Sequence, residues 1–447
     1  MAVIFACQSC GYETPKWLGR CPSCLAWNSF AEEKVDRKKP RQASGPSEGP
    51  VKLNEFTDND RERIVTGNGE FDRVLGGGIV PGSLVLLSGD PGIGKSTLLL
   101  QISEILGKTA GKVLYVSGEE SPAQVKSRAR RLGLSLENVY FLPETDIYKI
   151  EESIKNLSPA VVAVDSIQTV YNPDMPSIAG SLGQIRESTV RLQQIAKKDN
   201  IPVFLVGHIT KDGAIAGPKV LEHIVDTVLY FENMDSNIYR LLRTVKNRFG
   251  STNEIGIFLM DAEGLTEVKN PSGVFLDSYN KNVSGTSVAC CMEGTRPVLI
   301  EVQALCVSSG ANFPRRTAVG VDPGRVAIII AVLEKRAGIL LSSEDIYVNV
   351  AGGLKITEPS LDLAIAASLI SSYRNSQAPA DTVFIGEIGL GGEIRQVDRI
   401  DVRLKEIEKL GFKRCVLPAG ISDKTIGKCS LEIIKAATIR DLTTAVF

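Results

Sequence analysis

Residues 89–96, GDPGIGKS, have the types and the spacing needed to hold the phosphates of a nucleotide. They follow an apolar run at 83–89 and begin a helix-like run, STLLLQISEIL, at 96–106. Glycines let backbone N–H groups surround phosphate oxygens, the helix N-terminus favours an anion, and Lys95 can reach the β- and γ-phosphates. Ser96 can coordinate Mg²⁺. The sequence therefore predicts an ATP and Mg²⁺ site rather than an unliganded Gly-rich turn, and its expected residues are Gly89, Asp90, Pro91, Gly92, Ile93, Gly94, Lys95, Ser96 and Thr97.

Polar side chains end the neighbouring apolar runs. Asp165 ends the run AVVAVD, where a second carboxylate can hold the magnesium ion through water. Glu119 and Glu120 follow the run KVLYVSG, and we expect Glu119 to orient and deprotonate the attacking water. Two solvated loop glutamates are the alternative interpretation. His208 ends the run IPVFLVGH and could sense the γ-phosphate and relay its presence to the loop that begins at Lys211.

Lys246 and Arg248, in the motif KNRFG, lie two positions apart at the end of a strand-like run, YRLLRTV. Strand alternation would place both cations on one face, where they could stabilise charge on a phosphate bound by an adjacent subunit. A pair of solvated surface charges is the alternative.

The N-terminus carries two Cys-x-x-Cys pairs separated by ten residues, Cys7 with Cys10 and Cys21 with Cys24. Thiolates on two tight turns can converge on one ion, and this spacing is typical of a zinc ribbon with four cysteine ligands. Iron or a redox disulfide pair is the alternative. A module of about 30 residues buries too little apolar area to fold alone, so we expect the zinc to be structural.

Two tryptophans and an arginine accompany these cysteines. Trp17, Arg20 and Trp27 could face DNA or a protein partner, or the aromatic rings could pack the small core of the zinc module. The sequence leaves both interpretations open.

The remainder of the chain must position these residues. A chain of 447 residues is too long for a single hydrophobic core, so we expect more than one domain. Short apolar runs alternating with helix-length segments predict an α/β fold with a mostly parallel sheet covered on both faces. The C-terminal part of the sequence begins with strand-like runs and continues with a mixture of helix-like and strand-like runs. The predicted organisation is a zinc ribbon at 1–30, a linker at 31–54, an ATPase domain at 55–269 and an α+β domain at 270–447.

Composition and charge exclude several classes of protein. Hydrophobic residues at 43% and charged residues at 23% are ordinary for a folded protein, and no apolar run approaches a membrane span. The first residues lack the basic segment of a signal peptide, so we expect a cytoplasmic protein without a membrane partner. Because the net charge is -1, any contact with nucleic acid must come from local basic patches.

The phosphate loop, the segment TGNGEFDRVLGGGIVPG at 66–82, KNRFG and the cysteine pairs together resemble the bacterial RadA (Sms) family of recombination proteins, within the RecA-like ATPases. The resemblance covers nearly the whole chain. It implies a homo-oligomeric, hexameric ring that binds single-stranded and branched DNA, drives branch migration or unwinding, and works with a recombinase of the RecA type.

The same resemblance carries residue roles. Lys95, Ser96 and Asp165 match the family's nucleotide site, and Glu119 matches the catalytic glutamate of RecA-like ATPases. Lys246 and Arg248 match the family motif that acts across subunits. By analogy, the loops at 172–182 and 211–217 are expected to face DNA.

The C-terminal segment resembles the proteolytic domain of Lon, in GGLKITEPSLDLAIAASL at 352–369 and in the segment at 386–412. Ser360 occupies the position of the nucleophile, whereas Asp401 falls where the resemblance expects the lysine base. Lys405, about one helical turn away, is the only substitute. We therefore expect a scaffold without protease activity. Arg315, Arg316 and Lys335 could contribute a basic surface to it, or lie on an ordinary solvated face.

Three functions compete on these grounds. A DNA-dependent ATPase motor is favoured because the phosphate loop, KNRFG and the zinc ribbon occur in one chain. A regulatory ATPase related to KaiC would bind no DNA. An ATP-dependent, Lon-like protease would require Ser360 to be activated.

Overall fold

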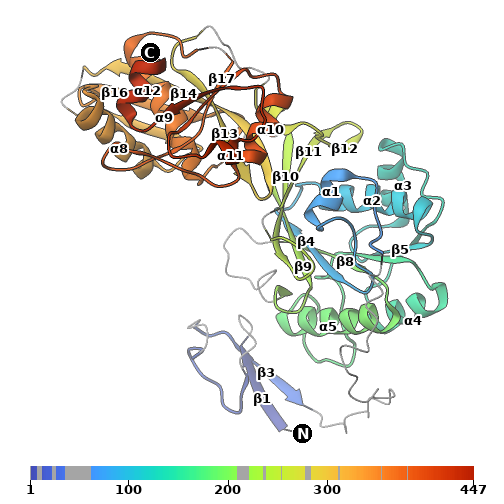
Figure 1. Ribbon diagram of the computed structural model, residues 1–447. Helices are drawn as coiled ribbons and strands as arrows, with labels where there is room; N and C mark the ends of the chain where they lie inside the picture. Colours follow the sequence, from blue (N-terminus) through green and yellow to red (C-terminus); the bar gives the residue numbers. More distant parts are fainter. Residues whose placement is uncertain are drawn as a thin grey trace, which may run out of the picture. The chain divides into compact units, whose positions relative to one another are not determined.

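The computed structural model describes residues 2–7, 13–22, 27–35, 62–208, 221–234, 238–252, 254–276, 283–310, 313–353, 355–379 and 381–446 (Figure 1). The chain divides into two compact units. The first comprises Met1–Asn233 with Ile238–Glu267, and the second comprises Met234–Asn237 with Val268–Phe447. The division after Glu267 lies close to the predicted boundary at residues 269 and 270.

The N-terminal residues form a three-stranded antiparallel sheet in the order β2-β1-β3, from β1 (Ala2–Cys7), β2 (Glu13–Thr14) and β3 (Phe30–Val35). The predicted linker starting at residue 31 is wrong in its first residues, because β3 continues to Val35. Backbone pairing with β1 runs as far as Ala2 opposite Val35, so the hydrogen-bond ladder outweighs the polar sequence AEEKV.

The first unit also contains a nine-stranded sheet in the order β12-β11-β10-β9-β4-β8-β7-β5-β6. All neighbours from β9 to β6 pair in parallel, whereas β10, β11 and β12 extend the sheet with antiparallel pairs. The predicted, mostly parallel sheet is confirmed. The strands are β4 (Leu84–Gly89), β5 (Val113–Ser117), β6 (Val139–Leu142), β7 (Val161–Asp165), β8 (Val203–His208), β9 (Thr227–Asn233), β10 (Tyr239–Asn247), β11 (Ile255–Asp261) and β12 (Gly264–Glu267).

Helices cover both faces of this sheet because its strands are apolar on both sides. In β4, Val85 and Leu87 join a core with the helices of one face, while Leu84 and Leu86 join the core of the other face. The first face carries α1 (Gly69–Val74), α2 (Lys95–Thr109) and α3 (Pro122–Arg131), and the second carries α4 (Ile147–Leu157) and α5 (Leu182–Asp199) (Figure 1).

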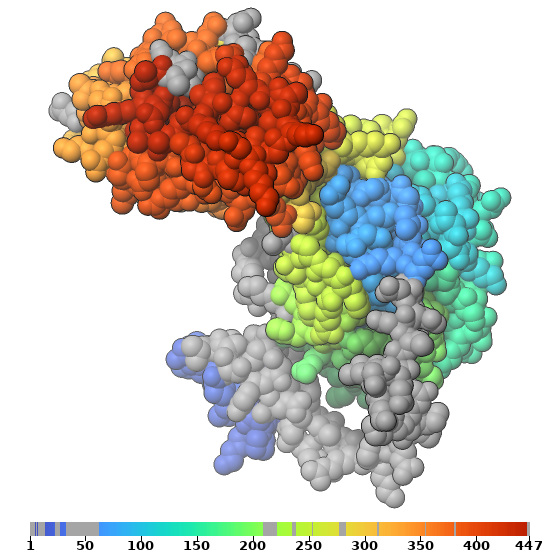
Figure 2. All heavy atoms as spheres, viewed as in Figure 1, coloured from blue at the N-terminus to red at the C-terminus, as the bar shows by residue number. Residues whose placement is uncertain are grey.

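Helix α1 lies against the antiparallel end of the sheet, although the two are far apart in sequence. Figure 2 shows the blue surface around α1 beside the yellow-green surface that contains β9 and β10. The hydroxyl of Thr244 in β10 donates to Val74 O at 2.7 Å. The antiparallel strands are thereby fixed to the part of the domain that carries the phosphate loop.

The second unit contains a seven-stranded sheet in the order β15-β16-β14-β13-β17-β20-β21, with parallel and antiparallel pairs. Its strands are β13 (Thr286–Glu293), β14 (Arg296–Ser308), β15 (Arg316–Val319), β16 (Glu344–Val350), β17 (Thr382–Phe384), β20 (Arg414–Pro418) and β21 (Glu432–Ala436). A separate hairpin joins β18 (Glu387–Ile388) to β19 (Ile394–Arg395). The helices are α7 (Pro271–Phe275), α8 (Pro323–Val332), α9 (Asp362–Arg374), α10 (Ile400–Lys409), α11 (Asp423–Ile426) and α12 (Ile439–Val446).

This mixture of strands and helices confirms the predicted α+β character of the second unit. Among the residues that the structure describes, no helix is both long and apolar enough to cross a bilayer.

Candidate nucleotide-binding site

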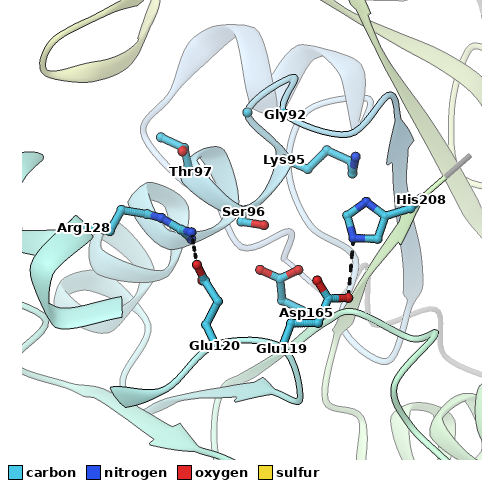
Figure 3. Close-up of a pocket in the computed structure, with 10 residues that line it drawn as sticks. Gly92, Lys95, Ser96, Thr97, Glu119, Glu120, Arg128, Asp165 and His208 are labelled. Carbon is cyan, nitrogen blue, oxygen red and sulfur yellow. Dashed lines mark hydrogen bonds and ion pairs between the residues drawn. The ribbon is translucent and has the colours of Figure 1, made fainter. Parts of the chain in front are cut away.

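A pocket of about 260 Å³ lies where β4, β5, β7 and β8 end (Figure 3). The carboxyl ends of parallel strands meet at one edge of a sheet, which explains why residues far apart in sequence converge here. The lining residues are Gly92, Gly94, Lys95, Ser96, Thr97, Glu119, Glu120, Arg128, Asp165 and His208. The structure thus brings together the predicted lysine, serine, aspartate, glutamates and histidine.

Glycine is required at two positions of the phosphate loop. Gly89 has φ +146°, and a Cβ there would lie 2.5 Å from Phe231 O. Gly94 is the N-cap of α2 with φ +116°, and a Cβ there would lie 2.6 Å from the Met260 side chain. The loop therefore packs against β9 and β11, with the N-terminus of α2 at the pocket.

Lys95 is the buried cation of the pocket, with only 3% of its surface exposed. Its Nζ donates to Gly89 O and to Asp90 O, both at 2.8 Å. Burial lowers the pKa of Lys95 to about 8, although the carboxylates of Asp165, Asp90 and Glu119 oppose this shift. An anion bound beside Lys95 would favour its charged form.

Asp165 is buried at the end of β7, and its Oδ2 accepts a hydrogen bond of 2.8 Å from the hydroxyl of Tyr115 in β5. Burial, together with the charge of Asp165, raises the pKa of Tyr115 well above its ordinary value. Tyr115 therefore stays protonated and serves as a fixed donor. Sequence reasoning missed this residue, whose only signal is a hydroxyl within an apolar strand.

Glu119 and His208 face each other in the pocket (Figure 3). Glu119 Oε1 accepts a hydrogen bond from Ser166 Oγ and lies 3.6 Å from His208 Nε2. Burial and the charge of Lys95 lower the pKa of His208, so the imidazole is neutral at pH 7. Among the described residues, neither ring nitrogen has a hydrogen-bond partner. The predicted relay from His208 to Lys211 ends in residues 209–220, outside those described.

Arg128 and Glu120 form an ion pair on the α3 side of the pocket (Figure 3). Sequence reasoning named Glu120 but missed Arg128, because four basic residues occur between positions 126 and 131 and nothing in their spacing marks one of them. Helix packing makes the distinction, since Val125 and Ala129 are buried and turn Arg128 toward the pocket.

Lys246 and Arg248 do not line the pocket. Lys246 Nζ donates to the carbonyls of Glu222 and Val225, the latter at 2.9 Å. Arg248 Nη1 pairs with Asp226 Oδ1 at 3.0 Å, and the arginine side chain stays 45% exposed. Both cations thus contact the segment that precedes β9, and their action on another subunit's nucleotide stays a prediction.

Two of the four predicted zinc ligands can be placed. Cys7 and Cys21 are buried in the same small core with Phe30, which fits two thiolates converging on one ion. Cys10 and Cys24 lie outside the described residues.

The two tryptophans do not pack that core. Trp17 and Trp27 are 52% and 70% exposed, and the guanidinium of Arg20 lies 5.6 Å from the Trp27 ring centroid. The interpretation of these rings as core residues is therefore wrong, because Phe5, Leu18 and Phe30 fill the core instead.

Ser360, in the second unit, is fully buried, with no exposed surface. Arg403 Nη1 lies 3.3 Å from Ser360 Oγ, which is 3.6 Å from Cys291 Sγ. The expectation that Asp401 faces Ser360 is wrong, and Lys405 does not replace it, because both are exposed on α10. The apolar stripe of α10 turns Arg403 inward, and a guanidinium does not release a proton to act as a base.

Family models match three segments of the chain. A rubredoxin metal binding domain matches residues 5–32, an AAA domain matches residues 58–214, and the subunit ChlI of Mg-chelatase matches residues 316–421.

Curated relatives match nearly the whole chain. The DNA repair protein RadA of Bacillus subtilis is 50% identical over 443 residues, which cover 98% of this chain and 97% of the relative. The protein of the same name from Halalkalibacterium halodurans is 52% identical over 446 residues, covering 98% and 97%. That of Listeria monocytogenes is 52% identical over 417 residues, covering 93% and 91%.

Solved structures also match part of the chain. A KaiC-like protein from Pyrococcus horikoshii has 20% identity and a TM-score of 0.39, covering 46% of this chain and 99% of that one. A RadB recombinase has 26% identity and a TM-score of 0.38, covering 46% and 100%.

Proposed function

Because this chain belongs to the RadA family of DNA repair proteins, we propose that it is a DNA-dependent ATPase motor. In this proposal, ATP hydrolysis drives movement on single-stranded DNA and on branched recombination intermediates. The proposed setting is the cytoplasm, in a hexameric ring that works with a recombinase of the RecA type.

The convergence of Lys95, Asp165 and Glu119 in one pocket is the observation that carries the proposal. Each has a distinct task in phosphoryl transfer, and the three come from separate elements: Lys95 begins α2, Asp165 ends β7 and Glu119 follows β5. Lys95 would hold the β- and γ-phosphates after its Nζ leaves the carbonyls of Gly89 and Asp90. Glu119, held by Ser166, would orient the attacking water and take its proton.

The oxygen donors in the pocket fit magnesium. The hydroxyl of Ser96 and the carboxylate of Asp165 both line it, and Mg²⁺ prefers such ligands together with phosphate oxygens and water. Magnesium bound there would neutralise charge on the phosphates. Tyr115 would keep the Asp165 carboxylate in position, because its hydroxyl occupies one carboxylate oxygen.

Lys246 and Arg248 would complete the site of a neighbouring subunit. They lie outside this chain's own pocket, and Arg248 is nearly half exposed. A cation that reaches the transferring phosphate from another subunit can accelerate hydrolysis without contributing to nucleotide binding. Such an arrangement requires a ring in which each interface is the same.

The loop between β7 and α5 would contact DNA. It includes Ile178, which is 84% exposed, whereas Asn172 at its base is buried and accepts from the side chain of Gln184. An exposed loop on a fixed base can follow a polynucleotide while staying attached to the strand that carries Asp165. The second predicted DNA loop, at 211–217, lies outside the described residues.

Steady-state ATP hydrolysis, measured with and without single-stranded DNA, tests the proposal. We expect DNA to raise kcat in the full chain, and we expect Lys95→Ala to show no hydrolysis in either condition. Hydrolysis that is equal with and without DNA, in a protein that binds no DNA, would support a KaiC-like regulatory ATPase instead.

A further inference from the structure

Arg128 is a charged group of the pocket that the proposed catalytic steps do not use. Its side chain is 19% exposed. Nη2 donates to Glu120 Oε1, whereas Nη1 is buried and has no hydrogen-bond partner among the described residues. A buried N–H without an acceptor costs free energy, so its presence in a binding pocket points to a ligand that supplies the acceptor.

The contact with Glu120 leaves this nitrogen available. Arginine and a carboxylate commonly pair through two parallel hydrogen bonds, which would use two guanidinium nitrogens. Here the pair forms one contact, and Glu120 Oε2 is likewise buried without a partner in the described part of the chain. Glu120 therefore holds the guanidinium in place and leaves Nη1 unpaired.

The position of Arg128 identifies which phosphate it can reach. In Figure 3, Arg128 and Lys95 lie on opposite sides of Ser96, and Thr97 lies toward Arg128. In phosphate loops the lysine reaches the β- and γ-phosphates, while the backbone holds the α- and β-phosphates. The end of the pocket away from Lys95 is therefore the α-phosphate end.

We propose that Arg128 is a nucleotide-binding residue whose Nη1 donates to the α-phosphate of ATP and ADP, while Glu120 holds Nη2. This inference rests on the proposed function, because it requires a nucleotide in this pocket. It assigns Arg128 to the subunit that binds the nucleotide, in contrast to Arg248. Glu120 is a positioning residue.

Calorimetric titration of the full chain with ATP and with ADP, in the presence of Mg²⁺, tests the inference. A charge-assisted hydrogen bond to phosphate predicts that Arg128→Ala weakens both nucleotides about 10- to 100-fold and equally. Arg131→Ala is the matched control, since Arg131 is an exposed arginine of the same helix, and it should leave both affinities unchanged. Thermal unfolding without nucleotide checks that each variant is folded.

Two further measurements separate phosphate binding from a structural tether. Glu120→Ala should weaken nucleotide binding less than Arg128→Ala, because Arg128 can still reach the phosphate. ATP with sulfur in place of a non-bridging α-phosphate oxygen should bind the wild-type chain more weakly than ATP, and Arg128→Ala should lose this preference.

Several outcomes would overturn the inference. If Glu120→Ala and Arg128→Ala lose equal amounts of nucleotide affinity, the ion pair acts only by joining α3 to the loop at 119–120. If Arg128→Ala loses affinity for ATP but not for ADP, the arginine contacts the γ-phosphate instead. If its affinities for both nucleotides are unchanged, Arg128 does not contact the nucleotide. If the wild-type chain binds neither nucleotide, the proposed function itself fails, which the wild-type titration shows before any variant is compared.

Discussion

The nucleotide pocket and the cluster around Ser360 both gather charged and hydroxyl groups, but they differ in how these groups are satisfied. In the pocket, Arg128 Nη1, Glu120 Oε2 and both ring nitrogens of His208 are buried without partners among the described residues. Around Ser360, all three nitrogens of the buried Arg403 donate hydrogen bonds, including one of 2.9 Å to Asp398 O. Unsatisfied groups indicate a ligand site, whereas a closed network indicates a structural role.

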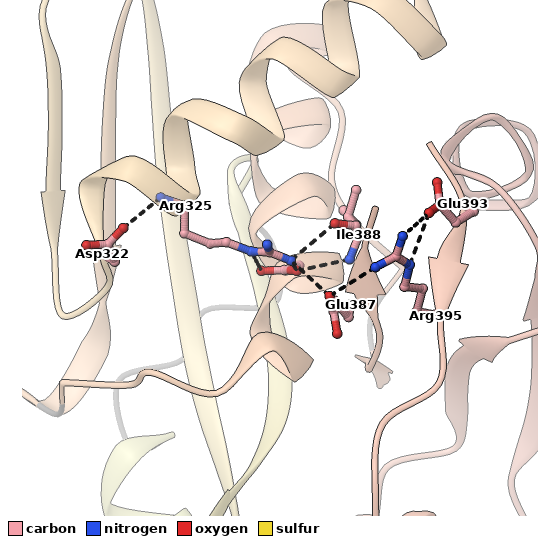
Figure 4. Close-up of polar contacts among 7 residues, drawn as sticks. Asp322, Arg325, Glu387, Ile388, Glu393 and Arg395 are labelled. Atoms are coloured by element: carbon pink, nitrogen blue, oxygen red, sulfur yellow. Dashed lines mark hydrogen bonds and ion pairs between the residues drawn. The ribbon is translucent and has the colours of Figure 1, made fainter. Parts of the chain in front are cut away.

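A second network of the C-terminal unit supports this contrast (Figure 4). Arg325 of α8 pairs with Asp362 of α9 and donates to Ile388 O at 3.1 Å, while Ile388 N donates to Asp362 Oδ2 at 2.9 Å. These bonds join α8, α9 and β18. Arg325 and Asp362 thus hold elements of this unit together, and the scaffold role of the unit stays a prediction.

The largest expected effect concerns the cation assigned to a neighbouring subunit. Arg248→Ala should lower kcat about 10³- to 10⁵-fold while leaving the Kd for ATP unchanged, because such a group acts on the transition state. Mixed with Lys95→Ala chains, the variant should regain activity, about a quarter of the wild-type rate in a randomly mixed ring. Loss of ATP binding, or no recovery on mixing, would contradict action across subunits.

The next largest effect concerns the closed network. Arg403→Ala removes one donor each from Glu358, Ser360 and the Cys290 carbonyl and breaks the buried pair with Glu358, so unfolding of the C-terminal unit should become easier by about 3–5 kcal/mol. Denaturant unfolding measures this loss. Arg395→Ala, which removes an exposed pair with Glu393, is the control and should cost about 1 kcal/mol or less. Equal losses would mean that Arg403 carries no special structural role.

A smaller effect tests the proposed magnesium site of the pocket. Tyr115→Phe removes the donor to Asp165 Oδ2, and we expect the Mg²⁺ concentration for half-maximal hydrolysis to rise about tenfold. Nucleotide affinity measured at saturating Mg²⁺ should be nearly unchanged. An unaltered Mg²⁺ dependence would show that Asp165 needs no support from Tyr115.

The smallest effect concerns pH. The pKa of Lys95 is about 8 in the free pocket, so its charged form, which binds phosphate, predominates below pH 8 and is lost above it. ATP affinity should therefore fall about twofold from pH 7 to pH 8 and be nearly flat below pH 7. The ATP affinity of Lys95→Ala should not show this fall between pH 7 and pH 8. A fall of the same size in the variant would assign the titration to another group.

Local sequence predicted the parts of the site that depend on neighbours along the chain. The phosphate loop and Asp165 are recognisable because a strand must precede each and a helix must follow the loop. Tyr115 and Arg128 were missed because their relevance depends on the pairing of β5 with β7 and on the packing of α3.

The same reason explains the errors in the two flanking regions. Counting along the sequence placed Asp401 at the position of the lysine base. In the structure, Arg403 lies on the buried face of α10 and contacts Ser360 instead. Composition suggested a linker from residue 31, but pairing with β1 extends β3 to Val35. In the first case the helical periodicity of α10 decides which residue is buried, and in the second case pairing with a distant strand decides where β3 ends.

A crystal structure of the full chain with Mg²⁺ and a non-hydrolysable ATP analogue tests the central claim most directly. It should show the triphosphate in the pocket, with Lys95 Nζ moved from the Gly89 and Asp90 carbonyls to the phosphates, and with the Arg403 network around Ser360 unchanged. A nucleotide bound elsewhere, or a pocket without nucleotide at saturating concentration, would contradict the account.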